Sequence, residues 1–183
     1  MKRNLKVLYL LMVIMMLGTS FPNFANAMTE INEFSDMNQI ENEVNKYVVS
    51  EGKEVKFNME QAILDGQSDF ILSIGENINT INSAYKNTVS TSNDVMMIPE
   101  LSLPIWGNWC GPGHGGGQPK DLLDYSCMLH DKDYAKYGYF DCGSDRRLIA
   151  NINLHYKNMG AVEKGVALAV KAYFQAQMLV NRC

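Results

Sequence analysis

The chain lacks several patterns that would place it in common protein classes. It has no C-x-x-C motif and no closely spaced pair of histidines, which argues against a zinc site. It has no basic run, so nothing in the sequence favours nucleic-acid binding. The G-x-S-x-G turn that presents a nucleophilic serine is also missing. There is no internal repeat and no low-complexity tract among the 183 residues.

The chain also lacks an apolar run long enough to span a bilayer. The N-terminal apolar stretch, residues 7–17, is shorter than the about 20 residues that a membrane-spanning helix needs. Basic residues precede this stretch, and helix breakers and the sequence ANA at 25–27 follow it. This three-part pattern is typical of a secretory signal peptide and predicts cleavage near Ala27 and a secreted protein. The alternative is an uncleaved membrane anchor.

Cysteine is scarce, and its four positions all follow residue 109: Cys110, Cys127, Cys142 and Cys183. An even number of cysteines in an exported chain predicts two disulfides. Four cysteines allow three pairings, and their spacing does not choose among them.

Charge divides the mature chain into two regions. Residues 28–103 contain 13 acidic residues and 4 lysines, a net charge of −9, whereas residues 104–183 carry a net charge of +2. We therefore expect an acidic N-terminal region at 28–98 and a disulfide-stapled domain at 99–183. The acidic region is interpreted either as a propeptide or as a permanent accessory domain.

Apolar periodicity predicts a mostly helical chain, with almost no strand signal in its C-terminal part. In the acidic region, helices are expected at 30–48 and 58–88, with a turn into a short extended piece at 51–57 and a linker at 87–104. In the C-terminal region, three helices are expected: from Pro119 to Gly138, from a cap at Ser144 or Asp145 to Tyr156, and from Ala161 to Val180. The predicted class is all-α.

Residues 105–119 hold six glycines and two prolines, a composition typical of a loop. Glycine lets main-chain carbonyls approach a small hard cation closely. Ca²⁺ accepts six to eight oxygen ligands, carbonyls and carboxylates among them. Asp131 is the candidate carboxylate if a Cys110–Cys127 bond holds this loop against the helix that carries it.

Three short motifs together resemble secreted, calcium-dependent phospholipase A2. They are Trp109-Cys110-Gly111-Pro112-Gly113, Cys127-x-x-His130-Asp131-x-x-Tyr134 and Asp145-Arg146. The resemblance covers about residues 105–160, and the short helical domain is most similar to the bacterial and fungal branch. It implies a disulfide-stapled, three-helix phospholipase A2-like domain with a Gly-rich calcium loop.

The resemblance also implies a role for each residue of the site. His130 is expected to draw a proton from water, while Asp145 holds its imidazole and Tyr134 hydrogen-bonds the same aspartate. The Gly111 N–H is expected to help stabilise the oxyanion. The Ca²⁺ ligands are expected to be the main-chain carbonyls of Trp109, Gly111 and Gly113, and the carboxylate of Asp131. An imidazole can act as a base near neutral pH, which suits this chemistry.

One departure from the animal enzymes concerns their cysteines, since Ser126, Asp133 and Ser144 stand where those enzymes carry half-cystines. The resemblance implies Cys110–Cys127, which leaves Cys142–Cys183.

The expected activity is hydrolysis of the sn-2 ester of glycerophospholipids at a membrane or micelle surface by a monomer, with no nucleic-acid partner. Two alternatives stay open: a non-catalytic lipid- or receptor-binding protein on the same scaffold, and a small structural exported protein. Retention of both His130 and Asp145 argues against pure binding.

Overall fold

The computed structural model describes residues 30–90 and 104–183. The predicted signal peptide at 1–27 and most of the predicted linker at 87–104 lie outside these ranges. The chain divides into two units, 1–30 and 31–183, and the second contains every helix and strand named below. Within the described ranges, no helix is both long and apolar enough to cross a bilayer.

The first helix of the second unit, α2, spans Met37–Asn45. Asp36 caps it, because its carboxylate accepts a hydrogen bond from the Asn38 N–H at 2.9 Å. The predicted helix at 30–48 was therefore too long at both ends. The residues before Asp36 form a turn, and those from Val48 enter a strand.

The described residues are mostly helical, as predicted, but a β-hairpin follows α2, which the all-α prediction did not include. Strands β1 (Val48–Glu51) and β2 (Glu54–Phe57) pair antiparallel, so the extended piece expected at 51–57 is one arm of a two-stranded sheet. Asn79 Oδ1 accepts the Phe57 N–H at 2.8 Å, and Asn82 Oδ1 accepts the Val55 N–H at 3.1 Å. Through these two bonds, side chains of the later helix at Asp69–Ser90 accept backbone N–H groups of β2. Buried backbone groups need such partners.

The helix predicted at 58–88 is two helices, α3 (Met59–Leu64) and α4 (Asp69–Ser90). Gly66 breaks the run with φ +71°, a left-handed conformation that glycine adopts without steric cost. The apolar stripe of α4 is fully or almost fully buried. It consists of Ile71, Ile74, Ile78 and Ile81.

The three predicted C-terminal helices are present as α5 (Leu122–Tyr137), α6 (Cys142–His155) and α7 (Ala161–Val180), with a short 3₁₀ turn, η2, at Tyr156–Asn158. The prediction that Ser144 or Asp145 caps α6 was wrong. Asp141 is the cap, and it accepts a hydrogen bond from the Ser144 N–H at 2.8 Å. Asp145 thus lies inside the first turn, where its carboxylate is buried.

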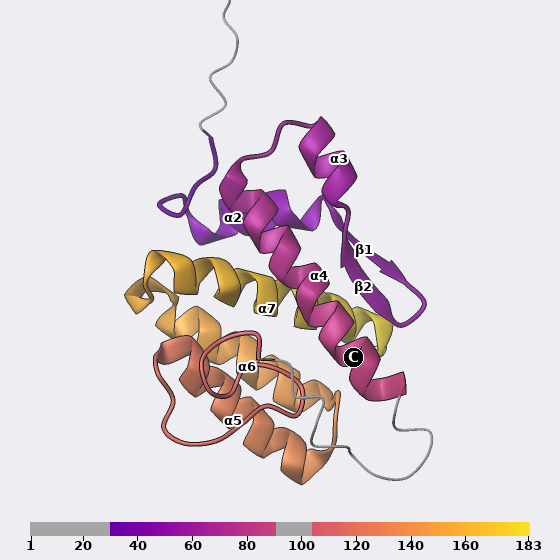
Figure 1. The fold of residues 1–183 in the computed structure, drawn as a ribbon, viewed down its shortest axis with the longest axis vertical. Coiled ribbons are helices and arrows are strands. Elements are labelled where there is room, and N and C mark those ends of the chain that lie inside the picture. The colour runs from indigo at the N-terminus through magenta and orange to yellow at the C-terminus, as the bar shows by residue number, and fades with distance from the viewer. Residues whose placement is uncertain (1–29, 91–103) are drawn as a thin grey trace, which may run out of the picture. The chain divides into compact units, whose positions relative to one another are not determined.

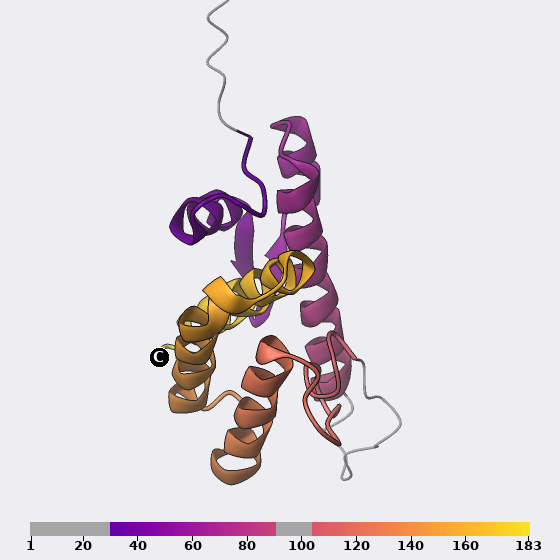
Figure 2. The ribbon, with the colours of Figure 1, turned by 90° about the vertical axis from the view of Figure 1, so that its left-hand side faces the viewer.

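Helix α7 is the centre of the core. It packs against α4 on one side and α6 on the other, and α6 pairs with α5 (Figures 1 and 2). Most of its residues between Gly165 and Gln177 are buried. The acidic region and the cysteine-bearing region therefore share one hydrophobic core.

A buried ion pair also joins the two regions. Lys171 on α7 is only 4% exposed, and its ammonium group bonds to the Glu41 carboxylate of α2. The same ammonium donates to Asn153 Oδ1 of α6 at 2.6 Å. A buried charge needs such partners, so this cluster links helices of both regions.

Two disulfides are present, and their pairing is the one that the resemblance implies. Cys110–Cys127 ties the glycine-rich loop to α5, and Cys142–Cys183 ties the start of α6 to the segment after α7.

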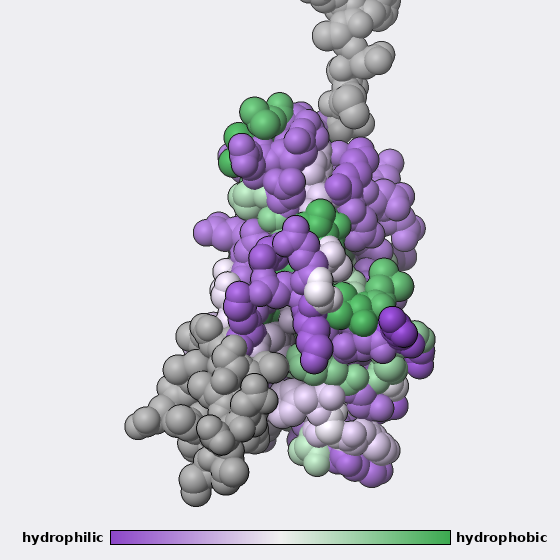
Figure 3. Space-filling model, turned by 90° about the vertical axis from the view of Figure 1, so that its right-hand side faces the viewer, coloured by the Kyte–Doolittle hydropathy of each residue, from purple (hydrophilic) through white to green (hydrophobic). Residues whose placement is uncertain are grey.

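On the face shown in Figure 3, hydrophobic residues form small groups separated by hydrophilic ones.

Candidate active site

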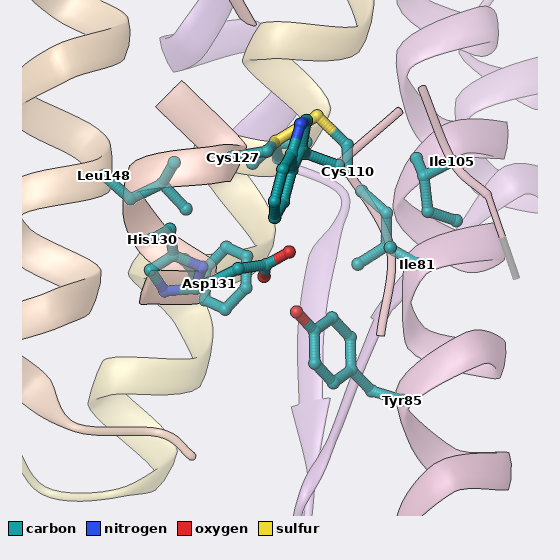
Figure 4. Close-up of a pocket in the computed structure, with 12 residues that line it drawn as sticks. Ile81, Tyr85, Ile105, Cys110, Cys127, His130, Asp131 and Leu148 are labelled. Carbon is teal, nitrogen blue, oxygen red and sulfur yellow. A yellow bond between two sulfur atoms is a disulfide. The ribbon is translucent and has the colours of Figure 1, made fainter. Parts of the chain in front are cut away.

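A pocket of ≈ 330 Å³, including its open mouth, lies between α4, the glycine-rich loop and helices α5 to α7. His130 and Asp131 line it from α5, and Cys110–Cys127 forms part of its wall (Figure 4). Trp109 and Gly111 contribute from the loop. The structure therefore brings the predicted base, the predicted carboxylate ligand and the glycine loop to one cavity.

The predicted pair His130 and Asp145 is in contact. His130 Nε2 lies 2.9 Å from Asp145 Oδ1, and both side chains are buried. Because an ionised carboxylate only accepts hydrogen bonds, this contact assigns the proton to Nε2 and leaves Nδ1 as the acceptor nitrogen. Such an imidazole can take a proton at Nδ1.

Tyr134 completes this arrangement one helical turn after His130. Its hydroxyl donates to Asp145 Oδ1 at 2.5 Å, and its ring packs on the imidazole with centroids 4.0 Å apart. Burial raises the pKa of Tyr134, so the phenol keeps its proton and remains a donor. The ring of Phe174 meets the imidazole edge-on at 4.8 Å from α7. Together these contacts fix the position of the ring.

The glycine-rich loop is anchored by a carboxylate that the sequence analysis did not include in the site. Asp124, fully buried on α5, accepts backbone N–H groups from Asn108 at 2.9 Å, Trp109 at 2.7 Å and Lys120 at 2.8 Å. Gly107 fits against it, since a Cβ there would lie 2.2 Å from the Asp124 side chain. The only sequence feature that could have indicated this anchoring role was an acidic residue shortly after the loop.

The surroundings of Asp131 are compatible with a bound cation. Burial, and to a lesser extent the nearby Asp124 carboxylate, raises the pKa of Asp131 to about 8. A positive ion at the site would offset the cost of keeping this carboxylate charged. The glycine-rich loop passes close to the Asp131 carboxylate at Gly115, where a Cβ atom would lie 3.4 Å from Asp131 Oδ2.

The described residues contain no cluster of three or more His, Cys, Asp or Glu side chains that would hold a metal by itself. A cation here would depend on main-chain oxygens of the loop. The Gly111 carbonyl accepts the His114 N–H at 3.1 Å and retains a second lone pair. Of the residues predicted to hold Ca²⁺, Trp109, Gly111 and Asp131 line the pocket, whereas Gly113 is not among its lining residues. Oxygen ligands of this kind suit a hard cation, and their role as ligands stays a prediction.

Replacing Asp131 by asparagine should weaken calcium binding strongly, because the predicted ligand set would lose its one charged oxygen. We expect an increase of about 10–100-fold or more in the calcium dissociation constant. Isothermal titration of the metal-free protein measures it directly. Asp133→Asn, on the same helix but paired with Arg147 at 2.6 Å, is the matched control. Equal calcium affinity in Asp131→Asn and wild type would remove Asp131 from the ligand set.

Sequence reasoning did not place several pocket-lining residues in the site, among them Ile81 and Tyr85 on α4. Both belong to the helical stripe of the acidic region, whose spacing predicts a buried face but not what that face covers. Their place in the pocket depends on packing between segments far apart in sequence.

Comparison with curated proteins gives a relative of this chain. A phospholipase A2 from Pithecopus azureus is 30% identical over 88 residues, which is 47% of this chain and 58% of that protein. The chain thus spans less than two thirds of the relative it matches. No family model matches the chain, and no solved structure matches it either.

The match supports likeness to phospholipase A2 at the family level and suggests a lipid hydrolase. It does not distinguish the bacterial and fungal branch, which stays a prediction.

Proposed function

We propose that the chain is a secreted, calcium-dependent phospholipase A2 that hydrolyses the sn-2 ester of glycerophospholipids at a membrane or micelle surface. The observation that carries the proposal is the buried His130–Asp145 pair, 2.9 Å apart, at a pocket shared with the glycine-rich loop and Asp131. The relative named phospholipase A2 supports the same chemistry. The protein is expected to act as a monomer after cleavage near Ala27, without nucleic acid.

In this proposal, His130 is a general base acting on water. Nδ1 accepts a proton from a water molecule while the oxygen of that water attacks the ester carbonyl carbon. The imidazolium then returns the proton to the leaving alcohol oxygen, which releases a lysophospholipid and a fatty acid. Asp145 stabilises the charged ring through Nε2, and Tyr134 keeps Asp145 oriented.

The developing negative charge on the carbonyl oxygen needs donors or cations close to it. Gly111 is suited to supply one donor, because no acceptor for its N–H is present in the described part of the chain. Trp109, Gly111, Gly113 and Asp131 are the proposed Ca²⁺ ligands. When bound, Ca²⁺ would polarise the ester carbonyl and stabilise the charge on its oxygen.

A non-catalytic lipid- or receptor-binding protein is the alternative from another class. Binding alone does not require an imidazole that is held by a carboxylate and a tyrosine. The buried Tyr134–Asp145–His130 arrangement therefore favours the enzyme.

One assay separates the alternatives. Fatty-acid release from phospholipid vesicles is measured with excess calcium and again with a chelator. The proposal expects release only with calcium. Vesicle binding without release in either condition would favour the non-catalytic protein. The absence of both binding and release would favour the structural one. Equal release with the chelator would contradict the role of calcium.

A further inference from the structure

Tyr85 belongs to α4, in the acidic region, yet it lies in the pocket of the candidate active site. Together with Ile81 it closes the side of the pocket that faces the glycine-rich loop and α5 (Figure 4). None of the three motifs of the site includes either residue. The N-terminal region thus supplies a wall of the cavity.

Three aromatic rings hold the ring of Tyr85 in place. Tyr173 stacks on it with centroids 5.5 Å apart, and Phe174 meets it edge-on at 5.7 Å. Phe140, from the segment before α6, packs at 5.6 Å. A ring enclosed in this way has little freedom to move, so the position of its hydroxyl oxygen is fixed. Phe174 also contacts His130, so the same cluster supports the imidazole.

The fixed hydroxyl points at a functional group. In Figure 4 the Tyr85 hydroxyl and the Asp131 carboxylate face one another across the pocket. Within the described ranges, neither Tyr85 nor Asp131 makes a side-chain hydrogen bond to another residue. Both groups line the same pocket, so this donor and this acceptor can pair there with each other or with a group that binds between them.

We propose that Tyr85 is a positioning residue for Asp131: its hydroxyl donates a hydrogen bond to the carboxylate when that carboxylate binds a divalent cation. This inference rests on the proposed function, because it names the residue that orients the carboxylate ligand. Carboxylates that bind metals are usually held by such hydrogen bonds, and loss of one weakens metal affinity by about 10–100-fold. The acidic region would then contribute directly to cation affinity.

The test is Tyr85→Phe, which removes only the hydroxyl and keeps the aromatic packing. Isothermal titration with calcium alone should give a dissociation constant about 10–100-fold higher than that of wild type. Tyr47→Phe is the matched control, since it also removes a tyrosine hydroxyl from the N-terminal region, where Tyr47 donates to Asp65 at 2.9 Å. Its calcium affinity should equal that of wild type.

Turnover as a function of calcium concentration distinguishes positioning from a structural role. Turnover of Tyr85→Phe should recover at saturating calcium, whereas a merely structural defect would lower it at every concentration. Wild-type calcium affinity in Tyr85→Phe, or equal losses in both variants, would overturn the inference and leave the proposed function intact. If the wild-type protein itself bound no calcium, both the inference and the proposed function would fail.

If Tyr85→Phe does not fold, the wild-type protein crystallised with calcium supplies a second measurement. The Tyr85 oxygen should then lie about 2.5–3.0 Å from an Asp131 oxygen. A hydroxyl turned away from a calcium-bound Asp131 would overturn the inference.

Discussion

Replacement of His130 by asparagine should lower phospholipid turnover by about 10²–10⁴-fold or more, with the fold retained. Asparagine is shorter than histidine, and its amide reaches the position of Nδ1 but not that of Nε2, so the hydrogen bond to Asp145 is lost. Tyr134 still donates to Asp145, which leaves that buried carboxylate with a partner. Asparagine has no group that accepts a proton from water near neutral pH, so the base is lost. Calcium affinity should change little, because His130 is not a proposed ligand.

The measurement is fatty-acid release from vesicles at saturating calcium, with the melting temperature followed in parallel. His155→Asn is the matched control, because His155 ends α6, does not line the pocket and packs edge-on against Tyr125. Turnover of this control should equal that of wild type. If His130→Asn kept a substantial part of wild-type turnover, the assignment of His130 as base would be refuted.

A fragment that begins at residue 99 should fail to fold. Its α7 would lose the apolar stripe of α4, in which four isoleucines are buried. Burial of one isoleucine side chain contributes about 1.5–3 kcal/mol, so this loss is comparable with the whole stability of a typical domain. The fragment would also lose Glu41, the buried ion-pair partner of Lys171.

Circular dichroism and thermal melting of the fragment test this expectation. A chain that begins at residue 28 is the control and should melt cooperatively. The net charge of −9 in residues 28–103 suits the propeptide interpretation, since its removal would favour docking on anionic membranes. A fragment from residue 99 that melts cooperatively and releases more fatty acid from anionic vesicles would establish that interpretation. The shared core favours a permanent region instead.

Local sequence signals predicted the C-terminal helices well. The expected bounds of α7 agree with the observed Ala161–Val180. The apolar periodicity stops at 158–160, which marks where this helix begins. The cap of α6 was misplaced because Asp141, Ser144 and Asp145 are all residue types that cap helices. Only the folded backbone shows that Asp141 accepts the Ser144 N–H.

Contacts between distant segments were less predictable. The contact between His130 and Asp145 was expected only from the resemblance, because fifteen residues separate them in sequence. The anchoring role of Asp124 and the place of Tyr85 depend on how a loop and a distant helix pack, and no local pattern encodes this. The hairpin at 48–57 was half predicted, because its first strand is exposed except for the half-buried Val48 and so has no alternating apolar pattern.

The most direct test of the central claim is a crystal structure of the wild-type protein grown with calcium. The account predicts one Ca²⁺ bound by the Asp131 carboxylate and the carbonyls of Trp109, Gly111 and Gly113, at about 2.3–2.6 Å. It also predicts a water molecule within hydrogen-bond distance of His130 Nδ1. Calcium bound elsewhere, or a loop free of calcium at saturating concentration, would contradict the account.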